Sequence, residues 1–556
     1  MKAFSQTFPA FAWAKHIAGS NNEYITASTM DNSGNIYITG GFEGSVDFDP
    51  GPALFALVAV GQRDVFVAKY TSTGAFVWAK QISGPQIEEA EAITVDNAGN
   101  VYVSGNFENT VDFDPGSGVY DITAKGQTDI FVLKLDAAGN FIWVNHCGGN
   151  NIEGSRSVVL DNANNLYVAG YFSGTVDFDP SAAVFNLTAG GGSDAYIAKF
   201  AASTGAFQWV KQFAGSSPLD YCDITKMVSD ASGNFYIAGS FQGTIDFDTG
   251  AGTSTLTSTG MSGDFFITKL DNSTGLIWLK YLDVSGFSLI TNLSLDNVGN
   301  LLLTGDFEST VDFDPGPGTF NLTPNGLSDV FVLKLTDTGN FVWALSVGGS
   351  TGYDTGYSLL TTATNDIIVT GTYQGTVDFD PGAPIYQISS DADSWDIFIL
   401  KLSSTGGFEW AKSVGGPDSD FPIMIHRDGF ENLYITGNFS GTCDFDPDIP
   451  TFYLSANQID AFILKLNASL TSYHASYVYP SFEIYPTVTN QTVYIRTQHT
   501  QNYTVQVFDN MGKKLFESQN ASAVPVHSFA TGLYYLRVQD NNSSFFQEYR
   551  FIVQQE

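Results

Sequence analysis

The sequence has few basic residues compared with its acidic ones. Lys and Arg number 23 against 58 Asp and Glu, which gives a formal net charge of −35 at pH 7. Residues 483–556 hold five Lys or Arg and six Asp or Glu, so residues 1–482 carry −34 of that total. Such a surface repels nucleic acid and anionic membranes and tolerates or attracts cations, and solubility alone is the alternative explanation of the charge. We therefore expect no nucleic-acid partner.

Cysteine, long apolar runs and catalytic motifs are also scarce. Cys147, Cys222 and Cys443 fall at unrelated places, which excludes a repeating disulfide framework, and an odd count leaves at least one thiol free. No apolar stretch has the length of a membrane helix, so we expect no transmembrane segment, and no signal peptide is visible at the start. The motifs G-x-S-x-G, H-E-x-x-H, the P-loop and S-x-D-x-G-x-T-W are missing, and we predict that the chain is not an enzyme.

One stretch is present in seven copies. Residues 105–115 read G-N-F-E-N-T-V-D-F-D-P, and each copy has a Gly seven residues before its Asp-Phe-Asp and an aromatic residue two positions after that Gly. A fixed period of this kind indicates a repeat architecture. The first Asp of each copy is Asp47, Asp112, Asp177, Asp246, Asp312, Asp378 or Asp444, at spacings of 65, 65, 69, 66, 66 and 66 residues.

Each repeat contains four segments with the character of β-strands. A run around a Trp, such as Trp143, is followed by an apolar segment, a Gly-Asn turn and a second apolar segment that ends at the repeat's Gly. The Asp-Phe-Asp corner and a strand of the type D-I-F-V-L-K complete the unit. Two hairpins per repeat predict a four-stranded propeller blade, and residues 1–467 are predicted to form an all-β, seven-bladed β-propeller.

The two ends of the repeat region complement each other. The seventh unit stops after Lys465 without a Trp strand, whereas the chain begins with an unpaired Trp strand at residues 11–18. We predict that this strand pairs beside residues 460–466 and closes the ring, which covers an exposed sheet edge. Residues 468–482 are interpreted as a linker, and the new strand-like runs of residues 483–556 predict a small β-sandwich.

Two resemblances follow from these motifs. The repeats, with G-T-V-D-F-D-P, D-I-F-V-x-K-L and G-N-F-x-W over residues 11–466, resemble the bacterial seven-bladed β-propeller repeat family, which implies a fold without a defined activity. The tail is similar to the C-terminal sorting domain of type IX secretion substrates (type A). It carries I-Y-P at 484–486, V-Q-V-F-D-N-M-G-K-K-L at 505–515 and A-T-G-L-Y-Y-L-R-V at 530–538. The positions that match the sorting motif are Pro486, Gly512, Gly532, Tyr534 and Arg550, the last where the family more often has Lys.

The second resemblance implies a destination and a partner. A sorting domain of this type implies export across both membranes of a Gram-negative cell by the type IX secretion machinery, followed by release or surface anchoring with the tail removed. Substrates of that route also need an ordinary signal peptide. Either the start of this sequence is trimmed or the gene start is misplaced, and we favour trimming. The usual Asn-Pro after Tyr-Pro is replaced by Thr487 and Val488.

The Asp-Phe-Asp corners have two interpretations. In an extended segment the two carboxylates share a side, and with turn carbonyls they supply several of the hard oxygens that Ca²⁺ requires, so Ca²⁺ is the candidate cofactor. The structural alternative is that the Asp side chains cap backbone N–H groups, the Phe fills space between blades, and the strand Lys neutralises one carboxylate. The metal hypothesis concerns Asp47, Asp49, Asp112, Asp114, Asp177, Asp179, Asp246, Asp248, Asp312, Asp314, Asp378, Asp380, Asp444 and Asp446.

Departures from the repeat are the places where a specific site is expected. At positions where other repeats have Thr, Val, Ser or Leu, the seventh has His426 and Arg427, and the sixth has an inserted Trp395. These three residues are the candidate ligand-binding residues, with rim variation as the alternative. Three functions remain open: an exported binding or adhesion module for a glycan or protein, a secreted polysaccharide-active hydrolase or lyase, and a structural component of the surface or matrix. The uniform repeats favour binding or structure over catalysis, and we predict the binding or adhesion module, on the outer surface of the cell or in the medium.

Overall fold

The computed structural model describes two compact units, residues 1–469 and 470–556. The residues it describes are 8–161, 163–258, 260, 263–382, 384–391, 394–448, 451–468, 482–485, 488–497, 503–509, 513–540 and 546–554. Every named element in these ranges is a β-strand, and none is a helix long and apolar enough to cross a membrane. The prediction of an all-β propeller is confirmed.

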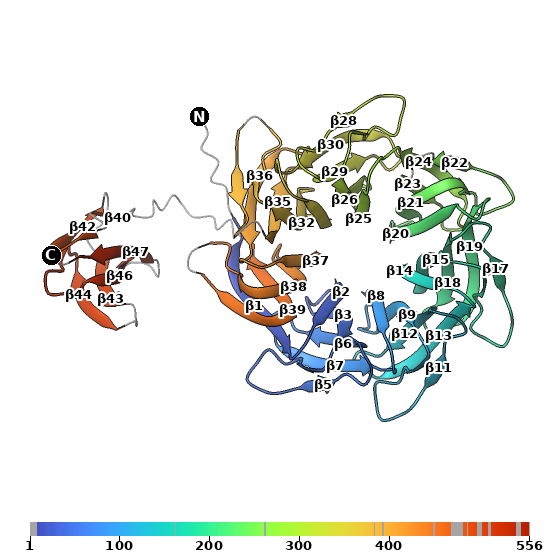
Figure 1. The fold of residues 1–556 in the computed structure, drawn as a ribbon, viewed down its shortest axis with the longest axis horizontal. Coiled ribbons are helices and arrows are strands. Elements are labelled where there is room, and N and C mark those ends of the chain that lie inside the picture. The colour runs from blue at the N-terminus through green and yellow to red at the C-terminus, as the bar shows by residue number, and fades with distance from the viewer. Residues whose placement is uncertain are drawn as a thin grey trace. The chain divides into compact units, whose positions relative to one another are not determined.

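Within the described residues, strand pairing gives seven four-stranded antiparallel blades arranged in a ring (Figure 1). From the inner to the outer strand, blade one is β2 (Glu23–Met30), β3 (Ile36–Phe42), β6 (Asp64–Tyr70) and β7 (Phe76–Ile82). Blade two is β8 (Glu88–Val95), β9 (Val101–Phe107), β12 (Asp129–Leu135) and β13 (Phe141–Gly149). Blade three is β14 (Glu153–Leu160), β15 (Asn165–Phe172), β18 (Asp194–Ala201) and β19 (Phe207–Gly215), and blade four is β20 (Tyr221–Ser229), β21 (Phe235–Asp246), β23 (Asp264–Leu270) and β24 (Leu276–Leu282). Blades five to seven are β25 (Leu289–Leu295), β26 (Leu301–Phe307), β29 (Asp329–Leu335), β30 (Phe341–Val347); β31 (Thr355–Thr361), β32 (Ile367–Gln374), β35 (Trp395–Leu402), β36 (Phe408–Val414); and β37 (Asp420–Arg427), β38 (Leu433–Asp444), β39 (Tyr453–Asn467), β1 (Ala10–Gly19).

The tight turns between the first and second strands explain the spacing of each repeat. Asp31 Oδ1 accepts hydrogen bonds from the backbone N–H groups of Ser33 and Asn35, both at 2.9 Å, so the carboxylate holds the turn closed. Gly34 has φ 78°, a left-handed conformation that glycine adopts without a steric penalty. The strands that follow, β3 and β6, are buried almost throughout because they lie between neighbouring blades.

The N-terminal strand closes the ring, as predicted. β1 pairs antiparallel with β39, in a register that runs from Ala10 opposite Asn467 to Ile17 opposite Ala461. Blade seven therefore takes three strands from the end of the repeat region and its outer strand from the beginning. This pairing joins segments more than 400 residues apart and removes two sheet edges at once.

Each Asp-Phe-Asp corner belongs to a short hairpin arm on the outside of its blade. The arm contacts the end of the outer strand of the preceding blade: Ala18 and Gly19 of β1 pair with Asp47 and Val46. The arms are β4 (Ser45–Asp47) with β5 (Ala56–Val58), β10 (Thr110–Asp112) with β11 (Asp121–Thr123), β16 (Thr175–Asp177) with β17 (Asn186–Thr188), β22 (Thr255–Ser258) with the end of β21, β27 (Val311–Asp312) with β28 (Asn321–Leu322), β33 (Thr376–Asp378) with β34 (Gln387–Ser389), and the end of β38 with the start of β39.

The C-terminal unit is a two-sheet β-sandwich. One core of buried residues draws on both sheets, including Val493 and Val524 from the first and Val505, Leu536 and Phe551 from the second. The first sheet is β40 (Phe482–Tyr485), β42 (Thr492–Thr497) and β45 (Ala523–Pro525). The second is β41 (Val488–Thr489), β47 (Phe546–Val553), β46 (Gly532–Asp540), β43 (Tyr503–Asp509) and β44 (Lys514–Gln519).

Candidate functional site

The carboxylates of the Asp-Phe-Asp corners bind backbone N–H groups. Asp112 Oδ1 accepts from the N–H of Asp114 at 3.0 Å and from that of Tyr120 at 2.7 Å. Asp114 Oδ1 accepts from the N–H of Gly116 at 2.8 Å. All seven corners repeat this arrangement, so the first Asp ties the two strands of the arm together and the second caps the turn.

The Phe of each corner is a core residue between blades. Phe113 is fully buried, and its ring centroid lies 5.2 Å from that of Phe107 and 5.1 Å from that of Phe131. Its core cluster also contains Val65 and Trp78 of blade one, so the side chain contributes to the contact between two blades. The prediction that these Phe residues are buried is confirmed at all seven corners: Phe48, Phe113, Phe178, Phe247, Phe313, Phe379 and Phe445.

The prediction that the strand Lys neutralises a corner carboxylate is wrong. Lys134 is the sixth residue of β12, so it lies roughly 17 Å along the strand from the end near the corner. Its Nζ lies 5.0 Å from the ring centroid of Tyr102 and donates to the carbonyl of Ala202 in the next blade at 2.9 Å. The Lys therefore stabilises the opposite end of the blade, where it contacts an aromatic ring and a turn.

The fourteen corner aspartates form no larger acidic cluster. Over the part of the chain that the structure describes, no group of three or more His, Cys, Asp or Glu side chains is placed to hold a metal ion. Each first Asp still has its Oδ2 outside the capping bonds described above. Calcium binding at the corners remains a prediction.

His426 lies on the innermost strand of blade seven. Its Nε2 is 2.7 Å from the hydroxyl of Ser28 in blade one, and Ser28 also bonds the hydroxyl of Thr436 at 2.7 Å. Burial and the nearby positive charge of Lys226 lower the pKa of His426 to about 4, so the imidazole is neutral at pH 7. His426 thus links the first and last blades, a contact that the sequence pattern did not indicate.

Arg427 and Trp395 lie at opposite ends of the strands. Arg427 ends β37 and forms an ion pair with Glu431, whereas Trp395 begins β35 and has its ring centroid 5.9 Å from that of Phe421, near the start of β37. Six residues of extended strand between Phe421 and Arg427 correspond to about 20 Å. The three predicted ligand-binding residues do not form one site.

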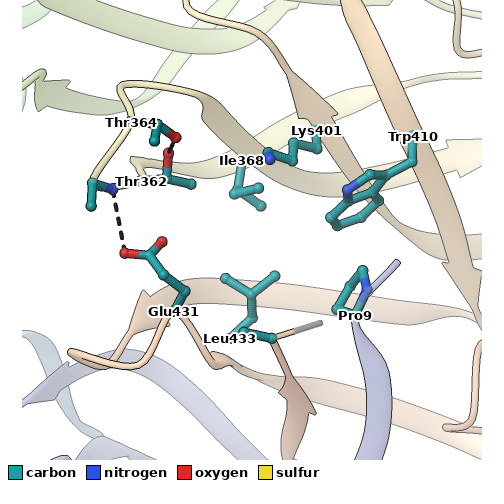
Figure 2. Close-up of a pocket in the computed structure, with 10 residues that line it drawn as sticks. Pro9, Thr362, Thr364, Ile368, Lys401, Trp410, Glu431 and Leu433 are labelled. Atoms are coloured by element: carbon teal, nitrogen blue, oxygen red, sulfur yellow. Dashed lines mark hydrogen bonds between the residues drawn. The ribbon is translucent and has the colours of Figure 1, made fainter. Parts of the chain in front are cut away.

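A pocket of about 220 Å³ opens where blades six and seven meet, and we call it the seam pocket (Figure 2). Ile368, Lys401 and Trp410 lie along one side, with Leu433 and Pro9 across from them. Its lining residues are Pro9, Thr362, Ala363, Thr364, Ile368, Lys401, Trp410, Glu431, Leu433 and Ala468. The floor is apolar, and one Lys, one Glu and two Thr surround it.

The closure of the ring explains why the pocket lies at this junction. At five other junctions a continuous turn reaches the Trp of the preceding blade; for example, a Cβ on Gly139 would approach the side chain of Trp78 to 3.1 Å. Blade seven has no such turn, because its outer strand comes from the N-terminus. In register, Pro9 takes the place of Gly139 and Ala468 that of Ala137. Two separate chain segments therefore replace one turn beside Trp410.

The polar residues of the seam pocket are held in place. Lys401 Nζ lies 2.9 Å from Glu409 Oε2 and 3.0 Å from Asp366 Oδ2, and these contacts outweigh burial and raise the pKa of Lys401. Glu431 accepts from the N–H of Ala363 at 3.3 Å and has φ 66°, where other turns use Gly or Asn. A left-handed conformation costs a non-glycine residue about 1–2 kcal/mol. Strain of this kind is frequent at functional sites.

A second exposed surface is formed by the tips of the arms. Four apolar side chains that precede the arm aromatic are between 68% and 77% exposed: Leu54, Val119, Val184 and Ile385. The neighbouring aromatic is partly exposed and lies 4.9–5.3 Å from an aromatic ring of the outer strand in six arms. These pairs are Phe55–Phe76, Tyr120–Phe141, Phe185–Phe207, Phe320–Phe341, Tyr386–Phe408 and Phe452–Phe11.

A groove beside one arm shows what this surface offers to a ligand. Its volume is about 490 Å³, and it runs between the arm of blade two and Pro180 of blade three. Tyr120, Thr123, Val144 and His146 line it. Thr110 and Thr123 face each other across the arm, with their hydroxyls 2.7 Å apart. Aromatic faces, hydroxyls and carboxylates thus recur around the ring.

Three of the five predicted sorting-motif positions, Gly532, Tyr534 and Arg550, lie within the described residues. Gly532 begins β46, and Tyr534 is buried, donates its hydroxyl hydrogen to the carbonyl of Ala530 at 2.8 Å and stacks with Phe551 at 5.7 Å. Arg550 pairs with Tyr535 through the backbone. Pro486 and Gly512 lie outside the described residues.

Comparison with known proteins identifies the tail. Residues 483–554 match the family described as the secretion system C-terminal sorting domain, so the chain carries such a domain and the prediction for the tail is confirmed. The sorting domain indicates export to the outer surface or the medium.

The repeats have distant relatives. The chain is 24% identical over 490 residues to an uncharacterised WD repeat-containing protein of Acanthamoeba polyphaga mimivirus, across 71% of this chain and 34% of that protein. It is 27% identical over 145 residues to the regulatory protein FlaEY of Caulobacter vibrioides, across 25% and 14%. The alignments thus cover about a third or less of these relatives' own length.

Among solved structures, a europium-containing methanol dehydrogenase is similar, with a TM-score of 0.37, 11% identity and coverage of 82% of this chain and 93% of that one. PorZ of Porphyromonas gingivalis, described as an essential bacterial surface component of the type-IX secretion system, has a TM-score of 0.25, 13% identity and coverage of 99% and 87%.

Proposed function

We propose that this protein is an exported surface or secreted binding protein that holds a repetitive polysaccharide through the arms of its propeller. Its C-terminal domain delivers it by the type IX secretion machinery. The observation that carries the proposal is the recurrence of partly exposed aromatic pairs in six of the seven arms that the structure describes. Exposed apolar patches on a soluble protein are typical of interaction sites.

The chemistry of the arms suits a sugar polymer. Aromatic rings provide flat apolar faces for the C–H surface of a sugar ring, while the Thr hydroxyls beside them, such as Thr110 and Thr123, are partners for sugar hydroxyls. The charge of −34 on residues 1–482 disfavours an acidic polymer. We therefore expect a neutral or amino-substituted polysaccharide.

Several weak sites on a rigid ring bind a long polymer more tightly than one site does. Once one arm is engaged, the next contact forms at a high effective concentration, and avidity can exceed the affinity of a single site by about 10²–10⁴. This mode explains why the arms are uniform, since a catalytic centre would need one set of distinct residues.

The test uses affinity electrophoresis and calorimetry on a neutral glucan, an amino-polysaccharide and an acidic polysaccharide. Leu54→Ser, Val119→Ser, Val184→Ser and Ile385→Ser alter exposed side chains and are expected to leave the melting temperature unchanged. Combining them one by one is expected to weaken binding stepwise, whereas Phe287→Ser, 79% exposed but outside the arms, is the matched control. Equal binding by the fourfold variant and the control would refute the proposal.

A further inference from the structure

The tyrosine that precedes the repeat's Gly by three residues is absent from two blades. It is Tyr37, Tyr102, Tyr167, Tyr236 and Tyr434 in five blades, and it is Leu302 in blade five and Ile368 in blade six. Ile368 lines the seam pocket. Blade six is therefore the one blade in which both the tyrosine and the following turn are missing at the same junction.

The five tyrosines show what this position accommodates. In each, the Nζ of the strand Lys lies over the phenol ring, 4.5–5.1 Å from its centroid. The Trp of the outer strand lies 5.9–6.3 Å from the same ring, in a tilted or edge-on contact. In four of them the hydroxyl donates to an Asp carboxylate at 2.9–3.1 Å.

The seam pocket keeps two of the groups that surround the phenol in the other blades, the strand Lys and the outer-strand Trp. Lys401 and Trp410 occupy the same repeat positions as Lys134 and Trp143, which contact Tyr102. Thr362 stands where four other blades have the Asp that accepts from the phenol, and Asp366, four residues further on, supplies a carboxylate beside Lys401. What is missing is the ring itself. Apolar cavities of about 150 Å³ bind benzene, and the pocket measures about 220 Å³.

We propose that the seam pocket binds a phenolic ring, which takes the place that a tyrosine side chain holds in five other blades. The ring lies between Lys401 and Trp410, above Ile368 and Leu433, and its hydroxyl faces the acidic and hydroxyl groups at the edge of the pocket. The ammonium group attracts the face of an aromatic ring and not that of a saturated one. This site is separate from the arms and independent of polysaccharide binding.

Calorimetry and saturation-transfer NMR on the full chain test this with p-cresol and cyclohexanol, which share a ring and a hydroxyl but differ in the π system. We expect p-cresol to bind on the order of tenfold more tightly. Ile368→Tyr supplies the ring internally and is expected to abolish p-cresol binding. Leu302→Tyr places the same residue at the equivalent position of blade five and is expected to leave binding unchanged.

Two sources of the ring are distinguished with acetyl-Gly-Tyr-Gly-amide. Binding of the peptide at least as tight as that of p-cresol indicates a tyrosine side chain of a partner, and binding of p-cresol alone indicates a small phenol. Equal affinity for p-cresol and cyclohexanol in the wild type would overturn the proposal even if Ile368→Tyr failed to fold. So would p-cresol binding that survives in a folded Ile368→Tyr variant.

Discussion

The buried carboxyl group of Glu88 is expected to make the propeller less stable at alkaline pH. Glu88 begins the inner strand of blade two and is fully buried at the junction with blade one. Burial and the charge of Asp64 raise the pKa of Glu88 from its ordinary 4.5 to about 8. Asp64 accepts from the N–H groups of Val60 at 2.9 Å and Gly61 at 3.2 Å.

The free energy of unfolding depends on pH because folded Glu88 holds a proton that the unfolded chain releases. Below about pH 4.5 both states are protonated and Glu88 contributes nothing. Between pH 4.5 and 8, Glu88 is ionised in the unfolded chain but still protonated in the folded protein, so each rise in pH favours the unfolded chain. The free energy of unfolding therefore falls as pH rises, by about 3 kcal/mol at pH 7 and roughly 5 kcal/mol at pH 9 for this group alone.

Replacing Glu88 by Gln removes the titration and keeps the size and shape of the buried side chain. We expect Glu88→Gln to match the wild type near pH 5 and to be more stable by a few kcal/mol near pH 9, as measured by denaturant unfolding at a series of pH values. Glu89→Gln, which alters the partly exposed partner of Arg63, is the control and is expected to show a small, pH-independent change. If the stability difference between Glu88→Gln and the wild type is the same at both pH values, the reasoning is wrong.

Four further predictions follow from the fold. Deleting residues 1–18 removes β1, so the melting temperature should fall with a loss of several kcal/mol, and an unchanged melting curve would contradict ring closure. Phe113→Ala should cost about 3–5 kcal/mol in denaturant unfolding, and a cost below about 1 kcal/mol would contradict its place in the core. Asp114→Asn keeps an oxygen acceptor, so it should lower the free energy of unfolding much less than Phe113→Ala does if the corner only caps its turn. If the corner binds Ca²⁺, EDTA should lower the melting temperature of the wild type. A melting temperature that changes with neither EDTA nor Ca²⁺ would refute the metal hypothesis. In a type IX-competent cell, with a signal peptide restored, a chain without residues 483–556 should stay in the periplasm, and its normal delivery, seen by cell fractionation, would refute the sorting assignment.

Much of the fold is predictable because its causes lie within one repeat. The Asp of each Asp-x-x-Gly-Asn turn and the two Asp residues of each corner bind backbone groups within eight residues, so their roles follow from local spacing. The missing Trp strand after Lys465 indicated ring closure, because a seventh blade without an outer strand leaves an unpaired edge.

The candidate site was predicted less well. His426 and Trp395 stood out as departures from the repeat, yet one joins Ser28 of the first blade and the other contacts Phe421. The sequence did contain a signal for the seam pocket, because Ile368 stands at a repeat position where five of the seven blades have Tyr. The sequence did not predict a pocket there, because no pattern shows that this repeat position lies beside the Trp of the same blade and the turn of the next blade.

By itself the sequence determined the period, the turns, the four strands of each unit and the identity of the tail, since each rests on spacings within a few dozen residues. Only the tertiary structure decided that the strand Lys contacts a tyrosine and not a corner carboxylate, that Glu88 lies beside Asp64, and that Pro9 and Ala468 leave a pocket at Trp410. Those outcomes depend on contacts between blades and on burial, which lowers the local dielectric constant and shifts pKa values. Neither the contacts between blades nor the burial of a side chain can be inferred from the repeat pattern, because both arise only when the blades pack into a closed ring.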